Sequence, residues 1–424
     1  MRIYSLTTFT LLSTITGGHR RSVRCCAWKP QPQSKSNTSK PRPAPVLATG
    51  SFDATAAIWI GQPPTDRDGE EADATITRGA DEDAQDEDED DYHFAVVLEG
   101  HDSEIKSLAW SYSGTYLATC SRDKSVWLWE SLGSGDGDDA GFGYAGPRGF
   151  AGDDDEDNYE TVAVLQEHDG DVKCVAWHPE EETCLASASY DEAVRVWRED
   201  PSDGEWGCVA VLEGHRGTVW AVDWEGGGGR KEEGEHKDRV DPAARDQDGD
   251  EGMGMNGLEA VSGPRLISCS DDKSIRVWRR RPKAPKPAPA SGPRIPSSIR
   301  SSGYEEEWYE EAQLPQRHER AIYAVAWSKK TGRVVSVGSD GRIVVYQESE
   351  GARAMDGTTD EAPQIKPSSW TVVKEIEGAH GVYEINHVCW AKRWDRGKTN
   401  GEEEVIISTG DDGEVKVWTL DIVS

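Results

Sequence analysis

The apolar positions of the chain come in short runs that predict strands rather than helices. Ile105–Trp110 alternates apolar and polar residues, Tyr116–Cys120 is a second run after a Ser-Gly turn, and Val126–Trp129 is a third. A period of two, with turn residues between the runs, is typical of β-hairpins. A fourth run ends just before a histidine, as at Val96–Leu98 and Val209–Leu212. The pattern therefore predicts units of four short strands.

Marker residues recur in each unit at fixed spacing. A histidine precedes a tryptophan by nine residues five times and by ten once: His19/Trp28, His101/Trp110, His168/Trp177, His215/Trp224, His318/Trp327 and His380/Trp390. An aspartate precedes an aromatic residue by six: Asp53/Trp59, Asp123/Trp129, Asp191/Trp197, Asp272/Trp278, Asp340/Tyr346 and Asp412/Trp418. A hydroxyl residue stands four before each aspartate: Thr49, Thr119, Ser187, Ser268, Ser336 and Ser408. Six such units resemble the WD40 repeats of an all-β propeller.

A shared hydrogen-bond chain explains why these four residue types recur together. The aspartate would accept from the histidine ring, the histidine would meet the hydroxyl, and the hydroxyl would meet the indole N–H, so each buried polar group has a partner. Two such structural sets are His101, Thr119, Asp123 and Trp129, and His215, Ser268, Asp272 and Trp278. A Ser-His-Asp set also suggests a hydrolase, but repetition in every unit favours a structural role. We therefore expect no enzyme activity and no catalytic residue.

The net charge of −32 is concentrated in two stretches. Residues 61–91 hold 14 acidic residues against 2 arginines, a net of −12, and residues 131–160 hold 9 against 1, a net of −8. Such runs are typical of solvated insertions. This acidity argues against a nucleic-acid partner. No apolar run approaches the ~18 residues of a membrane span, so no membrane partner is expected.

The eight cysteines indicate a reducing compartment. None forms a Cys-x-x-Cys pair, and most fall inside apolar runs. Metal sites are normally marked by such ligand spacing, so buried free thiols, without metal or cofactor, are expected. Cys25-Cys26 leaves direct metal binding as an alternative, although adjacent residues on a strand point to opposite faces.

The whole chain, 1–424, is predicted to form a single propeller interrupted by insertions. The repeats cover about 14–60, 96–130, 162–199, 209–280, 312–348 and 372–420. Disordered insertions are expected at about 31–44, 61–91, 131–160, 225–260, 281–303 and 349–368. Their Pro, Gly, Ser and charged composition is typical of flexible loops.

Residues between the markers resemble one family within the WD40 class. The string Leu117–Trp127, preceded by Leu98–His101, is similar to the third blade of the cytosolic iron–sulfur assembly WD40 proteins, in a form with long insertions. Further matches are Gly50–Thr55, Leu185–Asp191, Leu212–Trp220, Ser268–Lys273 and Gly410–Val415. The resemblance implies a non-catalytic scaffold that helps deliver iron–sulfur clusters to apo-proteins of the cytosol and nucleus. Its implied partners are other components of the targeting complex and the client apo-proteins.

The chain departs from that family in one respect. The family has seven blades, whereas six repeats are recognisable here, and the first aligns with the family's second. Ile3–Ile15 resembles the outer strand that ends the family's first blade. We therefore expect the initiating blade to be absent, with either a six-bladed ring or an open gap as the result.

Partner binding is expected on the face where the loops before the inner strands gather. Arg122 precedes a turn aspartate, and a second set stands four residues before the inner-strand tryptophans: Arg24, Lys106, Lys173, Trp220 and Tyr323. Arginine and tryptophan dominate interface energetics, and a basic-aromatic surface suits an acidic or carboxylate-ending peptide. The alternative is that these cations only keep the channel mouth solvated. The alternative function is that of a generic WD40 scaffold in a chromatin or ubiquitin-ligase complex, because a fold alone does not determine a function.

Overall fold

The computed structural model describes residues 1–31, 43–62, 92–132, 158–226, 263–281, 306–349, 368–399, 401 and 403–420. Within these ranges every regular element is a strand, which confirms the all-β prediction. The cores of all six predicted insertions lie outside the described residues. The chain divides into two compact units, Met1–Trp177 with Arg393–Glu403, and His178–Lys392 with Glu404–Ser424.

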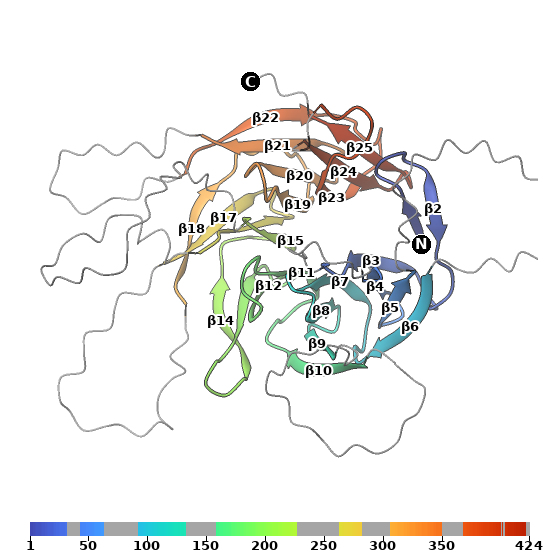
Figure 1. The fold of residues 1–424 in the computed structure, drawn as a ribbon. Helices are drawn as coiled ribbons and strands as arrows, with labels where there is room; N and C mark the ends of the chain where they lie inside the picture. Colours follow the sequence, from blue (N-terminus) through green and yellow to red (C-terminus); the bar gives the residue numbers. More distant parts are fainter. Residues whose placement is uncertain are drawn as a thin grey trace, which may run out of the picture. The chain divides into compact units, whose positions relative to one another are not determined.

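Unit 1 contains two four-stranded antiparallel sheets, β3-β4-β5-β6 and β7-β8-β9-β10 (Figure 1). Their strands are β3 (Val23–Trp28), β4 (Val46–Ser51), β5 (Thr55–Gly61), β6 (Tyr92–Glu99), β7 (Ile105–Trp110), β8 (Tyr116–Ser121), β9 (Val126–Leu132) and β10 (Asn158–Leu165). The unit also contains the hairpin β1 (Arg2–Tyr4) and β2 (Leu11–Thr14), and strand β11 (Val172–Trp177).

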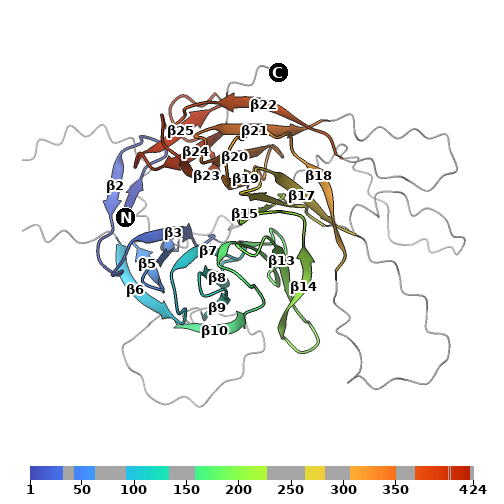
Figure 2. The ribbon, with the colours of Figure 1, turned by 180° about the vertical axis from the view of Figure 1, so that it is seen from behind.

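Unit 2 contains the sheets β15-β16-β17-β18, β19-β20-β21-β22 and β23-β24-β25, and the strands β12, β13 and β14 (Figure 2). The bounds are β12 (Cys184–Ser189), β13 (Val194–Glu199), β14 (Trp206–Leu212), β15 (Val219–Trp224), β16 (Leu266–Ser270), β17 (Ile275–Arg280) and β18 (Trp308–Gln313). They continue with β19 (Ile322–Trp327), β20 (Val334–Gly338), β21 (Ile343–Glu348), β22 (Trp370–Ile376), β23 (Ile385–Lys392), β24 (Glu404–Gly410) and β25 (Val415–Thr419). The third repeat, 162–199, thus contributes β10 and β11 to unit 1 and β12 and β13 to unit 2.

The strand before each histidine completes the sheet of the preceding repeat. β6, which ends two residues before His101, pairs with β5 from Thr55↔Glu99 to Gly61↔Tyr92. β14, before His215, pairs with β13 in the same way. Each sequence repeat is therefore offset from its sheet by one strand, so consecutive sheets are linked by chain continuity.

The core lies where small and branched side chains of the second strands are covered on both faces. All six residues of β12 are buried, and in β8 only Tyr116 is partly exposed. In unit 1, Ile58, Leu98, Ile105 and Leu117 form one buried cluster with Trp129. Burial at about 25 cal/mol per Å² of apolar area is the main stabilising contribution.

The first residues differ from the expected single outer strand. Residues 2–14 form the hairpin β1-β2, because the backbone reverses between them: the Phe9 amide donates to the Ser5 carbonyl oxygen at 2.8 Å, and Phe9 has a φ of 58°. The Ser5 hydroxyl accepts from the amide of Thr7 at 3.1 Å. Ile15, just after β2, is buried with Leu47 and Trp59 of the first sheet.

A buried ion cluster stabilises the sheets of unit 2. The Arg265 side chain is 4% exposed and lies between three glutamates. It donates two hydrogen bonds to Glu225, at 2.8 and 2.9 Å, two to Glu348, at 2.8 and 3.0 Å, and one to Glu311, at 3.1 Å. Its guanidinium carbon lies 5.0 Å from the ring centre of Trp327. These contacts hold the pKa of Glu225 below its usual value, since bonding to Arg265 outweighs burial.

Candidate functional site

The recurring marker residues form buried hydrogen-bond quartets. His101 Nδ1 lies 2.8 Å from Asp123 Oδ2, His101 Nε2 lies 2.9 Å from Thr119 Oγ1, and the Trp129 indole donates to the same hydroxyl oxygen at 3.0 Å. The chain of donors runs from indole to hydroxyl to imidazole to carboxylate. Equivalent bonds join His215 to Asp272 and Ser268, with Trp278 donating to Ser268.

The other repeats repeat this arrangement with small variations. His19, His318 and His380 bond to the corresponding aspartates and hydroxyls, and Trp197 donates to Ser187 at 2.8 Å. The glycine before the histidine leaves room for a neighbouring ring, because a Cβ at Gly100 would lie 2.5 Å from the Trp127 ring. Each of these quartets joins residues of one repeat, so its histidine is bonded to the aspartate and hydroxyl of its own repeat.

Hydrogen bonding keeps the quartet aspartates ionised. Burial raises the pKa of Asp123, but bonds from His101 and Ser125 outweigh it and hold the pKa well below its usual value. Burial also raises the pKa of Asp53, but hydrogen bonds from Thr55 and the Arg20 amide outweigh it and lower this pKa to about 2. Each carboxylate also caps its own turn, as when Asp123 accepts from the Ser125 amide at 2.9 Å.

Four of the expected partner-binding residues, together with Asn386 at the same position of the last repeat, share a backbone feature that the sequence did not reveal. The register of the first two strands slips by one residue at Arg24, Lys106, Trp220, Tyr323 and Asn386. Each of these residues is the extra one of a β-bulge, which redirects a side chain away from the regular alternation. Their common position, four residues before the inner-strand tryptophan, therefore has a structural cause.

Unit 1 carries four of the expected residues, which we call the cationic surface: Arg24, Lys106, Arg122 and Lys173. Arg122 lies in the turn after β8, and its side chain is 59% exposed while Nη1 lies 3.4 Å from Glu104 Oε1. Lys173 lies on β11, and its ammonium is 3.1 Å from Oδ2 of Asp171, which directly precedes that strand. Arg24, on β3, is exposed. The guanidinium of Arg122 is thus held loosely by one carboxylate and stays open to solvent.

The charges and rings of this surface influence one another. The Lys106 ammonium lies 4.8 Å from the ring centre of Phe52, which is a cation–π contact. Burial, together with Lys173 and Arg122, lowers the pKa of Lys106, although Glu104 and Asp171 oppose this. The Glu104 carboxylate accepts a bond from Ser103 and lies near Lys106 and Arg122, which lowers its pKa to about 2. Phe52 precedes the turn residue Asp53 as Arg122 precedes Asp123, so its repeat position was visible in the sequence. Sequence reasoning missed Glu104, because nothing in the repeat marks it.

The two aromatic residues lie in unit 2, beside carboxylates. Trp220 is the second residue of β15, and its indole donates to Asp271 Oδ1 at 2.5 Å. Tyr323 is the second residue of β19, and its hydroxyl donates to Glu384 Oε2 at 3.0 Å. The two rings meet edge to face, with centres 5.2 Å apart. The structure therefore groups the four cations in one unit and the two aromatic residues in the other, and their joint surface stays a prediction.

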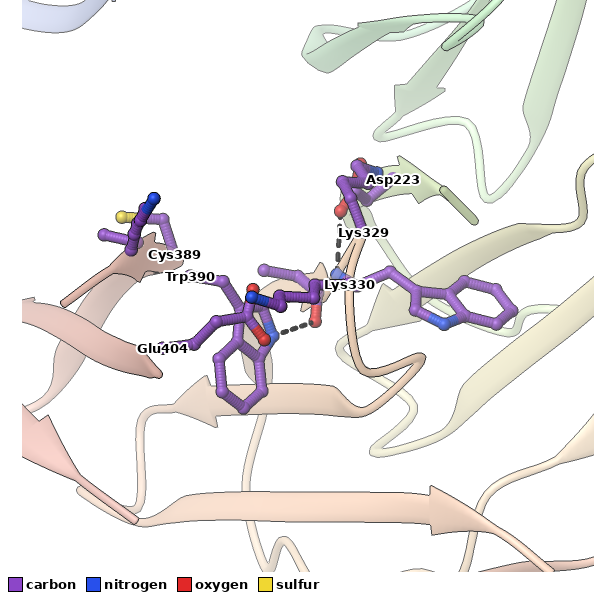
Figure 3. A pocket seen from close by; sticks show the side chains of 10 residues that line it. Asp223, Lys329, Lys330, Cys389, Trp390 and Glu404 are labelled. Carbon is purple, nitrogen blue, oxygen red and sulfur yellow. Dashed lines mark hydrogen bonds and ion pairs between the residues drawn. The ribbon is translucent and has the colours of Figure 1, made fainter. Parts of the chain in front are cut away.

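A hollow of about 500 Å³ lies in unit 2 at the other ends of its inner strands (Figure 3). Asp223, Lys329, Trp390 and Glu404 are among its lining residues. Asp223 Oδ1 is 2.8 Å from the Lys329 ammonium, and Glu404 accepts from the Ser328 hydroxyl at 2.6 Å. Both carboxylates thus already have partners within the protein, which suits a structural role better than proton transfer.

The described cysteines are free thiols. Cys25 is partly buried and Cys26 is exposed, and burial raises the pKa of both thiols. In the described part of the chain, no group of three or more His, Cys, Asp or Glu side chains could hold a metal ion. Within the same residues, no helix has the length and apolar character that crossing a membrane requires.

Comparison with protein families gives matches along the repeats. The family model "WD domain, G-beta repeat" matches residues 9–59, 93–130, 159–198, 260–279 and 312–347. The sixth repeat lies outside these matches, yet its side chains form the same quartet: His380 Nε2 is 2.8 Å from Ser408 Oγ, and Trp418 donates to that oxygen at 2.8 Å. Its extra residue between His380 and Trp390 alters the spacing without breaking the network.

Relatives match the chain over nearly its full length. The Aspergillus terreus protein named "Probable cytosolic iron-sulfur protein assembly protein 1" is 52% identical over 434 residues, covering 99% of this chain and 90% of the relative. The Aspergillus flavus protein of that name is 49% identical over 437 residues, with the same coverage. The Botryotinia fuckeliana protein is 42% identical over 445 residues, covering 99% of this chain and 89% of the relative.

Proposed function

Because this chain belongs to the family of cytosolic iron-sulfur protein assembly protein 1, we propose that it is a non-catalytic WD40 scaffold of cytosolic iron–sulfur protein assembly. It binds other components of that machinery and the apo-proteins that receive clusters. It acts in the cytoplasm, and in the nucleus where clients reside there. Its contribution is to bring partners together, since proximity alone raises the effective concentration of a bound pair.

The cationic surface of unit 1 is the proposed site for an acidic partner segment. This assignment rests on the exposed Arg122 guanidinium. Its Nη1 lies 3.4 Å from Oε1 of Glu104, which is the one carboxylate paired with it among the described residues. A partner carboxylate can take up the remaining N–H groups of Arg122 in a bidentate pair. Lys106 and Lys173 add positive charge beside it, and Arg24 and Lys106 are the extra residues of β-bulges.

Charge reversal at Arg122 tests this site. The variant Arg122→Glu should weaken binding of the assembly partners at least about 30-fold, equivalent to about 2 kcal/mol, as measured by titration with purified partners. Lys374→Glu, on the exposed side of the outer strand β22, makes the same charge change and should bind normally. Arg122→Lys should retain part of the affinity, because it keeps the charge but loses the planar fork.

Two outcomes separate the site from the function. If Arg122→Glu folds normally and binds partners unchanged, Arg122 does not belong to the site. In cells that rely on this chain alone, loss of the protein should lower the cluster content of cytosolic iron–sulfur enzymes. Normal cluster content after its loss would contradict the assembly role itself.

A further inference from the structure

We propose that unit 2 carries a second docking surface, which binds a cationic peptide segment that also has apolar side chains. This acidic-aromatic surface lies where β15, β19 and β23 begin, and it comprises Trp220, Asp271, Tyr323, Val382, Tyr383, Glu384 and Asp411. The three strands lie in contact in that order within the unit. The surface goes beyond the proposed site of unit 1, because its charge has the opposite sign.

The loop before β23 supplies exposed apolar side chains. Val382 is 95% exposed and Tyr383 is 50% exposed. At the equivalent positions the other repeats have polar or small residues, such as Asp102-Ser103-Glu104 and Glu319-Arg320-Ala321. The extra residue between His380 and Trp390 lengthens this loop, and Gly381 within it has a φ of 67°, a left-handed conformation that favours glycine. Exposed apolar side chains beside a polar rim are typical of protein-binding surfaces.

Two aromatic rings beside this loop are held in fixed positions. The Trp220 indole is bound to Asp271, the Tyr323 hydroxyl is bound to Glu384, and the rings pack edge to face. Glu384 is held in turn by the Ser339 hydroxyl at 2.9 Å. Both residues are the extra residues of β-bulges near the start of their strands, and both are partly exposed. Ordered aromatic side chains bind a partner at low cost in conformational entropy.

The carboxylates of this surface are bonded to neutral groups of the protein. Asp271, Glu384 and Asp411 accept hydrogen bonds from neutral donors: Trp220, Tyr323 with Ser339, and Asn386. Among the described residues, no ion pair joins these three carboxylates to a cationic side chain. Lys416, in the last repeat, is instead bound to Asp412 and Glu414.

The occupant follows from this combination of groups. Carboxylates that lack a cationic partner favour a positively charged ligand, and an arginine or lysine can also stack on Trp220 or Tyr323. Val382 and Tyr383 require apolar side chains next to those charges. A segment in which basic and apolar residues alternate meets both requirements.

Fluorescence anisotropy with synthetic peptides tests the proposal on the full chain. The probe is a fluorescein-labelled peptide of alternating leucine and arginine. Peptides of the same length with alternating glycine and arginine, or leucine and glutamate, are the controls. We expect the Leu/Arg peptide to bind, the Gly/Arg peptide to bind at least about tenfold more weakly, and the Leu/Glu peptide not to bind.

Variants then locate the binding. The double variant Asp271→Asn/Glu384→Gln should weaken binding of the Leu/Arg peptide at least about tenfold, and Val382→Ser should weaken it at ionic strengths that screen charge. The matched control, Asp203→Asn/Glu205→Gln, removes two carboxylates from the exposed turn between β13 and β14 and should change nothing. Val382 is almost wholly exposed, so its variant stays informative even if the double variant does not fold.

Three results would overturn the proposal. Equal binding of the Leu/Arg and Gly/Arg peptides would show only attraction to an acidic chain. Unchanged binding by both surface variants would place the peptide elsewhere. A dimer detected by light scattering, and abolished both by Arg122→Glu and by the Asp271/Glu384 variant, would assign the surface to a second copy of this chain. Loss of partner binding through Arg122 alone bears on the proposed function and leaves this surface unaffected.

Discussion

The indole nitrogen of Trp110, on β7, donates to the carbonyl oxygen of Ala27, on β3, at 3.2 Å. The same bond joins Trp177 to Ala109 at 2.9 Å and Trp390 to Ala326 at 3.1 Å. In each case the inner-strand tryptophan, nine or ten residues after the marker histidine, reaches the inner strand of the previous repeat. This tryptophan therefore links neighbouring sheets, whereas the tryptophan after the turn aspartate belongs to the quartet within one sheet.

Removing these inter-sheet bonds should lower stability. Trp110→Phe and Trp177→Phe keep an aromatic ring but leave the carbonyl of Ala27 or Ala109 without its indole donor. We expect each to lower the free energy of unfolding by about 1–3 kcal/mol, measured by urea denaturation. Trp28→Phe is the matched control, since Trp28 is 47% exposed, and it should cost below about 0.5 kcal/mol. Equal effects at all three positions would argue against the link.

Removing a quartet hydroxyl should lower the free energy of unfolding by more than the small size of the group suggests. Thr119→Val keeps the shape of the side chain but leaves His101 Nε2 and the Trp129 indole without their common partner. The expected loss in unfolding free energy is about 2–4 kcal/mol, because two buried polar groups become unsatisfied. Thr371→Val, on the exposed side of β22, should be nearly neutral. A double-mutant cycle with Trp129→Phe should show strong coupling, and additive effects would contradict the network.

Arg265 should contribute to stability mainly by neutralising its glutamates. Arg265→Met leaves Glu225, Glu311 and Glu348 together with less positive charge, and should cost about 3–5 kcal/mol in unfolding free energy. Arg281→Met, at a pair whose arginine is 54% exposed, should cost below about 1 kcal/mol. The loss in Arg265→Met should shrink as pH falls, because the glutamates then take up protons. A loss that does not depend on pH would indicate lost packing instead.

His178 should make stability depend on pH in mildly acidic solution. Burial, with Arg198 and Arg280 nearby, lowers its pKa from 6.5 to about 4, although Glu181 and Glu306 oppose this. Since the unfolded chain binds the proton at higher pH than the folded protein, stability is complete above about pH 6.5. It should fall by about 2–3 kcal/mol as pH decreases from about 6.5 to about 4.

The variant His178→Asn isolates this contribution. Its side-chain oxygen can replace His178 Nδ1, which accepts from the amides of Glu180 and Glu181 at 3.2 and 3.0 Å. Urea denaturation across this pH range should therefore show a shallower loss of stability in the variant. NMR titration of His178 near its ordinary pKa of 6.5 would contradict the prediction.

The recurring side chains made much of the fold predictable. The His-to-Trp and Asp-to-aromatic spacings predicted strand units, because a buried histidine such as His101 needs both a carboxylate and a hydroxyl partner in its own sheet. They did not reveal that β6 completes the preceding sheet. The hairpin at residues 2–14 was also missed, because its turn around Phe9 depends on backbone hydrogen bonds rather than on glycine or proline.

The candidate site was predicted only in part. The fixed spacing before the inner-strand tryptophan drew attention to Arg24, Lys106, Trp220 and Tyr323. The spacing could not show that each of these residues is the extra residue of a β-bulge. Nor could it show which carboxylate lies beside each. Glu104 faces Arg122 from the start of the neighbouring strand, and Glu384 reaches Tyr323 from a different sheet.

The amino-acid sequence by itself determined the strand units, their buried quartets and the family, because these depend on residue types at short, repeated spacings. Only the tertiary structure decided that Arg122 lies beside Glu104, while Trp220 lies beside Asp271 and Tyr323 beside Glu384. The physical reason is that the charge around a side chain comes from residues distant in sequence, which folding brings within a few ångströms. The repeated sequence pattern specifies where each strand forms, but it does not specify which charged side chains lie beside one another.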